Sequence, residues 1–219
     1  MTYSEASKLQ VEDSPVYFDW YRSHYSELSV NDVKTILRKL DETNPVQRRY
    51  DLSFIFDSLL RIQERLGTFN IVELGCHDGH LADQFALTTF GWHGYDLLNV
   101  VHRVKQRNKR FSFTELDQQI WTLPDIEFED SQVFIASHAL EHFSDKELPL
   151  LIEWMRRFRY IVVIVPLLAH GQNWQGYDGM HLLKMGYRRL GELLNMIWTP
   201  LTSQVGWDGS WDYFGIRKE

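Results

Sequence analysis

The chain is organised around the stretch Ile71-Val72-Glu73-Leu74-Gly75-Cys76-His77-Asp78-Gly79. It begins with a short apolar run, passes an acidic residue and ends with two glycines. Apolar residues at helical spacing follow it, at Leu81, Ala82, Phe85 and Ala86. This order predicts a strand, a tight turn and a helix, because glycine allows a sharp bend or a close approach of another group. In open α/β sheets, ligands bind beyond the carboxyl ends of the strands, where such a turn lies.

The spacing of the glycines indicates which nucleotide ligand suits this turn. A dinucleotide-binding fold uses Gly-x-Gly-x-x-Gly, so that a helix N-terminus can receive a pyrophosphate. Here the pattern is Gly-x-x-x-Gly with Glu73 before it, and no Lys or Arg occurs between Ile71 and Thr89. An acidic residue beside the turn favours a ligand that carries an ammonium and a sulfonium group over one that carries phosphates.

The same stretch resembles the first motif of the class I S-adenosylmethionine-dependent methyltransferases, acidic-x-Gly-x-Gly-x-Gly. Glu73, Gly75 and Gly79 match this motif, whereas His77 stands where the family usually has its middle glycine. The resemblance implies an S-adenosyl-L-methionine cofactor held at this turn, with Cys76 and His77 beside it.

Composition restricts the class of protein. The chain has 219 residues, enough for one α/β domain, and its 44% hydrophobic and 24% charged residues are ordinary for a soluble globular protein. A net charge of −7 argues against a general polyanion binder, and a single cysteine excludes an intrachain disulfide and a cysteine zinc site. The polar residues 1–15 do not form a secretory signal, and no apolar run is long enough to span a bilayer, so we expect a cytoplasmic protein.

The first third of the chain has helical patterns. One helix follows the capping residue Ser29, and a longer one begins at Pro45 and ends at Leu66, where Gly67 is suited to a C-cap. We therefore expect an N-terminal helical extension or cap over residues 1–67 and a cofactor-binding domain over residues 68–219.

The rest of the chain alternates between strand and helix patterns, which predicts parallel strands with right-handed crossovers. The expected strands are Ile71–Leu74, Trp92–Tyr95, Phe111–Leu116, Gln132–Ser137 and Tyr160–Val165, and helices are expected at Lys146–Phe158 and Tyr187–Ile197. An Asp-Gly connection then predicts an antiparallel hairpin of Leu201–Gly206 and Trp211–Arg217. The predicted fold is α/β: a Rossmann-like, mostly parallel seven-stranded sheet flanked by helices, with a C-terminal hairpin. Such a sheet resembles that of class I methyltransferases and differs from that of dehydrogenases.

Further candidate residues follow the predicted strands. Asp96 ends the second strand, where a carboxylate can accept hydrogen bonds from both ribose hydroxyls; alternatively, it caps the next helix. Asp117 and Gln118 follow the third strand, where the family often has an acid that binds the adenine amino group; alternatively, Asp117 caps a loop.

The segment Gln132–His142 resembles the fourth-strand region of the family, in which a small polar residue is followed by a Leu-Glu-His turn. With it, the resemblance covers residues 71–217. The implied cofactor-binding residues are Glu73, Gly75, Cys76, His77, Gly79, Asp96, Leu97, Asp117, Gln118 and Ser137.

Two histidines are candidates for a general base, since the ordinary pKa of histidine suits that role near neutrality. His138 directly follows the fourth predicted strand, and His181 lies in the long loop after the fifth, where related enzymes often have a histidine. The alternative for either is a structural role, which we favour for His142.

The resemblance and the residues together predict an S-adenosylmethionine-dependent methyltransferase that acts on an oxygen or nitrogen of a small molecule. Nucleic acid is a less favoured partner, because the basic residues at 103–110 fit a solvated helix end and no Asn- or Asp-Pro-Pro-Tyr follows the fourth strand. No membrane partner and no metal ion are expected. A non-catalytic cofactor-binding protein and a nucleotide-dependent oxidoreductase remain the alternatives.

Overall fold

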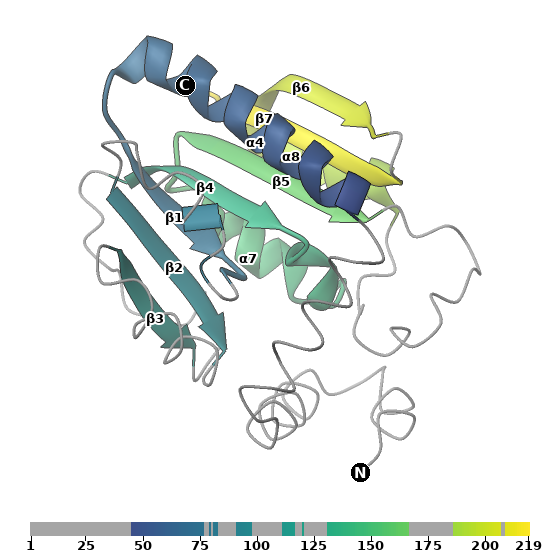
Figure 1. Cartoon of the computed structure of the whole chain (residues 1–219). Coiled ribbons are helices and arrows are strands. Elements are labelled where there is room, and N and C mark those ends of the chain that lie inside the picture. Colours follow the sequence, from purple (N-terminus) through teal and green to yellow (C-terminus); the bar gives the residue numbers. More distant parts are fainter. Residues whose placement is uncertain are drawn as a thin grey trace.

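The computed structural model describes residues 45–76, 79, 81–82, 91–97, 111–116, 120, 131–166, 186–206 and 209–219 (Figure 1). The expected helix after Ser29 lies outside these residues, and so does most of the helix expected after the glycine turn. Of that second helix, the structure describes Leu81 and Ala82, which are helical.

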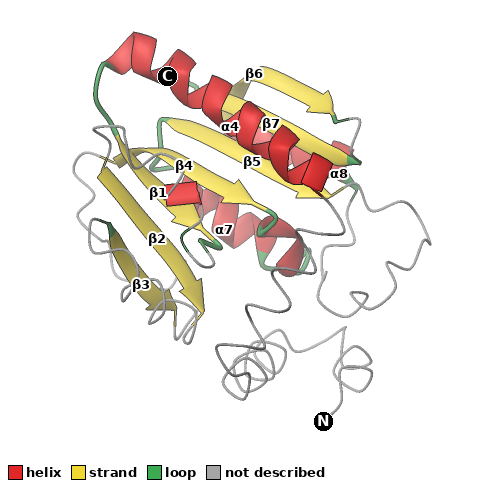
Figure 2. Cartoon of the chain, viewed as in Figure 1, coloured by secondary structure: helices red, strands yellow, loops and turns green. Residues whose placement is uncertain are grey.

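A seven-stranded sheet forms the centre of the molecule, in the order β3-β2-β1-β4-β5-β7-β6 (Figure 2). The strands are β1 Asn70–Leu74, β2 Gly91–Leu97, β3 Ser112–Leu116, β4 Ser131–Ser137, β5 Tyr160–Pro166, β6 Trp198–Val205 and β7 Ser210–Arg217. Strands β1 to β5 pair in parallel, whereas β7 pairs antiparallel with both β5 and β6. This arrangement confirms the predicted fold class and shows that the second strand of the hairpin inserts between β5 and β6.

The burial of each strand follows its place in the sheet. Strand β5 is central, and its residues Tyr160–Val165 are all buried, as in a parallel strand covered on both faces. Strand β6 lies at the edge, and most of its residues are exposed or half-buried. It begins at Trp198, earlier than the expected Leu201, and contains Pro200, which an edge strand tolerates because its outer backbone groups need no partner.

Helix α4, Pro45–Leu66, covers one face of the sheet, and its bounds agree with the prediction. Gly67 follows it with φ +75° and donates its N–H to the carbonyl of Gln63 at 2.8 Å, which ends the helix as expected. The apolar face of α4 shares one core cluster with the strands, including Ile55, Leu59, Ile62, Ile71, Val162 and Ile164. Helix α4 is therefore a layer of the sheet domain, while the division of the chain at residue 67 stays a prediction.

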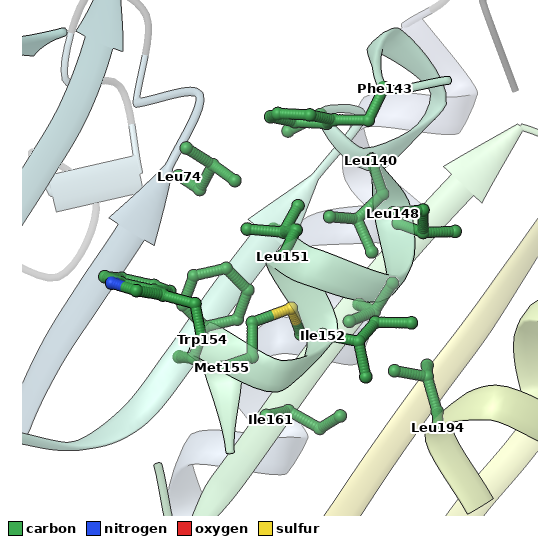
Figure 3. Packing of buried hydrophobic residues seen from close by; sticks show 14 of the residues in the cluster. Leu74, Leu140, Phe143, Leu148, Leu151, Ile152, Trp154, Met155, Ile161 and Leu194 are labelled. Carbon is green, nitrogen blue, oxygen red and sulfur yellow. The ribbon is translucent and has the colours of Figure 1, made fainter. Parts of the chain in front are cut away.

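The opposite face carries the helices α7, Leu148–Met155, and α8, Tyr187–Ile197, and the short 3₁₀ helix η2, Leu140–His142. Figure 3 shows side chains of α7 packed against those of the strands, with Leu74 at the end of β1 and Ile161 on β5. Helix α7 is shorter than the expected Lys146–Phe158. Among the described residues, no helix is both long and apolar enough to cross a bilayer.

Candidate functional site

The turn after β1 has the conformation that its glycines require. Gly75 and Gly79 both have φ +75°, in the left-handed region that glycine adopts at little cost. The backbone N–H groups of Gly75 and Cys76 both donate to the carbonyl of Tyr95 on β2, at 2.8 and 3.1 Å, and Gly79 donates to the carbonyl of Cys76 at 2.8 Å. These hydrogen bonds hold the turn against β2 and close it internally.

The same turn touches the turn that follows β4. A Cβ placed on Gly75 would lie 2.9 Å from the Cβ of Ala139, which is closer than real Cβ contacts. Strand β1 lies between β2 and β4 in the sheet. The connections from β1 and β4 therefore leave the sheet at its topological switch point, which is where open α/β sheets bind ligands.

Glu73, on β1, is buried and accepts a hydrogen bond from the indole Nε1 of Trp92 on β2, at 2.8 Å. The side chains of Ile71 and Trp92 belong to the core cluster on the α4 face of the sheet. The carboxylate therefore links two strands beneath the glycine turn. Its predicted contact with a cofactor stays a prediction.

The other predicted cofactor residues are described in part. Asp96 and Leu97 end β2, and the Asp96 side chain is half-buried. Cys76 is buried, and a Cβ placed on Gly94 would lie 2.6 Å from its Sγ, so the thiol packs against β2. Ser137, the last residue of β4, is half-buried. The predicted residues His77, Asp117, Gln118 and His181 lie outside the described residues.

His138 follows β4 directly and joins three elements. Its backbone has φ +53°, which is uncommon for any residue except glycine, and its N–H donates to the carbonyl of Ile164 on β5 at 2.9 Å. Its Nε2 lies 2.9 Å from Oδ2 of Asp51 on α4, and its Nδ1 lies 3.7 Å from Oε1 of Glu141 on η2. The imidazole is thus held between two carboxylates.

These carboxylates determine the charge of the imidazole. Burial alone would lower the pKa of His138, but the hydrogen bond to Asp51 and the charge of Glu141 outweigh this effect and raise the pKa from 6.5 to about 10. A raised pKa favours the imidazolium form at neutral pH, and an imidazolium has no lone pair to accept a proton. The contacts with Asp51 and Glu141 disfavour the neutral ring that a general base requires, and the catalytic role of His138 stays a prediction.

Sequence reasoning missed Asp51 and did not assign a role to Glu141. A signal was present, because Asp51 shares the apolar stripe of its helix with Ile55, Leu59 and Ile62, where a charged residue needs a partner. Within the described ranges, no group of three or more His, Cys, Asp or Glu side chains could hold a metal ion.

Comparisons with known proteins place this geometry in context. No protein-family model matches the chain, and no curated protein matches it. Among solved structures, the N-methyltransferase NodS from Bradyrhizobium japonicum WM9, in complex with S-adenosyl-L-homocysteine, has a TM-score of 0.61 and 17% identity over 82% of this chain and 91% of its own.

Two further solved structures are similar in the same way. Human N-acetylserotonin methyltransferase, in complex with S-adenosylmethionine, has a TM-score of 0.64 and 18% identity over 99% of this chain and 66% of its own. Magnesium protoporphyrin IX methyltransferase from Synechocystis PCC 6803, with bound S-adenosylhomocysteine, has a TM-score of 0.60 and 13% identity over 94% of this chain and 96% of its own. With its strand order and its antiparallel β7, the chain therefore has the fold of the class I S-adenosylmethionine-dependent methyltransferases.

Proposed function

We propose that the protein is an S-adenosylmethionine-dependent methyltransferase that methylates an oxygen or nitrogen atom of a small molecule. The observation that carries this proposal is the glycine turn after β1, which meets the turn after β4 at the switch point of a sheet with this strand order. The antiparallel β7 between β5 and β6 favours this function over a dinucleotide-dependent oxidoreductase.

The residues around this switch point fit the cofactor. Because Gly75 has no side chain, the turn after β1 can lie directly against Ala139 of the turn after β4. The half-buried carboxylate of Asp96 ends β2, where it can accept hydrogen bonds from two hydroxyl groups of a ribose. The remaining proposed contacts are Glu73, Cys76, His77, Gly79, Leu97, Asp117, Gln118 and Ser137.

When bound, S-adenosylmethionine supplies an electrophilic methyl group that an acceptor atom can take in line. The protein then contributes alignment of the two reactants and exclusion of water. For an acceptor that must lose a proton, His181 is our candidate base. His138 is the second candidate, and it can act as a base only from its neutral form, which its contacts with Asp51 and Glu141 disfavour.

The acceptor class is the least restricted part of the proposal. The structural neighbours include an N-methyltransferase, an N-acetylserotonin methyltransferase and a magnesium protoporphyrin IX methyltransferase, so the shared fold accommodates very different acceptors. The net charge of −7 supports a small molecule over a nucleic acid, because a polyanion binder carries a basic face.

Equilibrium binding tests the cofactor. Titration calorimetry should detect S-adenosylmethionine and S-adenosylhomocysteine but not NAD or NADP. Asp96→Ala should weaken binding about ten- to a hundredfold, because a charge-assisted hydrogen bond is worth about 1.5–3 kcal/mol. Asp57→Ala, an exposed position on α4, is the matched control and should leave the affinity unchanged.

Three outcomes contradict parts of the proposal. Binding of NAD or NADP in place of S-adenosylmethionine would point to the oxidoreductase. Unchanged affinity in Asp96→Ala would remove this residue from the site. Cofactor binding without any methylated product, across a screen that detects S-adenosylhomocysteine release, would point to the non-catalytic binding protein.

A further inference from the structure

We propose that Asp51 of helix α4 is a positioning residue, which holds the turn after β4 against the turn after β1 at the candidate cofactor site. The inference rests on the proposed function for the identity of that site, but the contacts that carry it are those of the protein itself.

The first step is the contact between α4 and the turn. Asp51 lies 87 residues before His138 in the sequence, and its Oδ2 is 2.9 Å from the imidazole Nε2. Only 8% of Asp51 is exposed, and its Oδ1 has no hydrogen-bond partner within the described structure. A carboxylate buried in this way needs a cation beside it, and His138 supplies one.

The second step leads from His138 to the contact between the two turns. The backbone of His138 has φ +53°, which an L-residue adopts only when its surroundings hold it there. The next residue, Ala139, packs so closely on Gly75 that a Cβ at the glycine would be 2.9 Å from its own. A change in the backbone at His138 would therefore move Ala139 relative to Gly75, and with it the spacing of the two turns.

The third step concerns the charges around the imidazole. Asp51 approaches it from α4 and Glu141 from η2, and these are the charged groups that the described residues place beside it. Together with the imidazolium they carry a net charge of −1. Removing the Asp51 charge leaves Glu141 as the remaining partner, so the pKa of His138 should fall and the ring should lose its proton at a lower pH.

The experiment compares the wild-type chain with Asp51→Asn, which keeps the shape of the side chain and removes its charge. NMR of the ¹⁵N-labelled imidazole should show His138 protonated well above neutrality in the wild type and a pKa lower by about one to three units in the variant. The amides of Ala139 and Gly75 should exchange hydrogen about tenfold faster in the variant, since the turn opens more readily.

Affinity for S-adenosylhomocysteine provides a second readout. In Asp51→Asn it should be about tenfold weaker at one pH unit above the pKa measured for His138 in the variant than at pH 6, because the ring loses its charge within that range. The wild type should show no such dependence from His138, and neither should Asp57→Asn, the exposed control on the same helix. A purely structural defect would weaken binding equally at both pH values.

Each combination of results either supports or overturns the proposal. A lower pKa with faster exchange and pH-dependent affinity supports the proposal. A lower pKa with unchanged exchange and affinity overturns it, and so does an unchanged pKa. If the wild type binds no S-adenosylhomocysteine, the proposed function fails, and the exchange of Ala139 and Gly75 still decides on Asp51.

If Asp51→Asn does not fold, His138→Gly takes its place, since glycine accepts the backbone conformation without the imidazole. The proposal requires this variant to exchange faster at Ala139 and Gly75; unchanged exchange would overturn it.

Discussion

Substitution of Gly75 by alanine tests the contact between the two turns. An L-residue at φ +75° costs about 1–2 kcal/mol. The new Cβ would also lie 2.9 Å from that of Ala139, whereas carbon atoms in good contact are about 3.5–4.0 Å apart. Overpacking of this kind costs typically about 1–3 kcal/mol. We therefore expect Gly75→Ala to lower the free energy of unfolding by about 2–5 kcal/mol.

Gly67 offers a matched control. It has the same φ of +75°, but nothing lies within 4 Å of a Cβ placed on it. Gly67→Ala should therefore lower the free energy of unfolding only by the backbone strain, about 1–2 kcal/mol. The difference between the two variants, measured by urea denaturation with equal m-values, isolates the contact with Ala139.

The double variant Gly75→Ala/Ala139→Gly completes the test. Without the Cβ of Ala139, the nearest remaining atom is its Cα, at an ordinary 3.8 Å. The two substitutions should therefore be non-additive by about 1–3 kcal/mol in the stabilising direction. Equal destabilisation by Gly75→Ala and Gly67→Ala, or strict additivity in the double variant, would refute the reasoning that these turns are in contact.

Three further predictions address an ion pair, a buried hydrogen bond and a metal ion. His138→Gln tests the ion pair of His138. Because the pKa of His138 is raised in the folded state, its contribution to the free energy of unfolding is fully present below pH 6.5 and is lost as the pH rises towards about 10. Allowing for partial exposure of the ring, the wild type should be more stable than this variant by about 2 kcal/mol at pH 6 and by less at pH 10. A stability difference that stays constant with pH in denaturation experiments would contradict the pairing of His138 with the two carboxylates. Glu73→Ala should cost about 1–3 kcal/mol in urea denaturation, because it leaves the buried indole N–H of Trp92 without this acceptor; wild-type stability would show that the bond contributes little. A chelator should leave methyl transfer intact, and activity lost with chelator and restored by a divalent ion would disprove metal independence.

Local sequence patterns predicted much of the fold, because helix ends and turns depend mainly on the backbone preferences of the residues that form them. Helix α4 begins at Pro45 and ends before Gly67, where the fixed φ of proline and the positive φ of glycine suit the two helix ends. Strand β1 and its glycine turn were recognisable from their residues alone. The start of β6 at Trp198 was not, because Pro200 argues against a strand until the edge position is known.

The chemistry of His138 shows where local information stops. Its place after β4 could be predicted from the sequence, and this place suggested a general base. The charge of its ring depends on Asp51, which is remote in sequence and reaches the turn only because α4 packs across the sheet.

The sequence by itself predicted the strands β1 to β5, their parallel pairing and the glycine turn that marks the candidate cofactor site, since these follow from periodicity and backbone preferences. Only the tertiary structure decided that β7 lies between β5 and β6, that Glu73 binds Trp92, and that His138 lies between two carboxylates that raise its pKa. The physical reason is that strand order, hydrogen-bond partners and pKa depend on which distant residues share a low-dielectric environment, and packing alone brings them together.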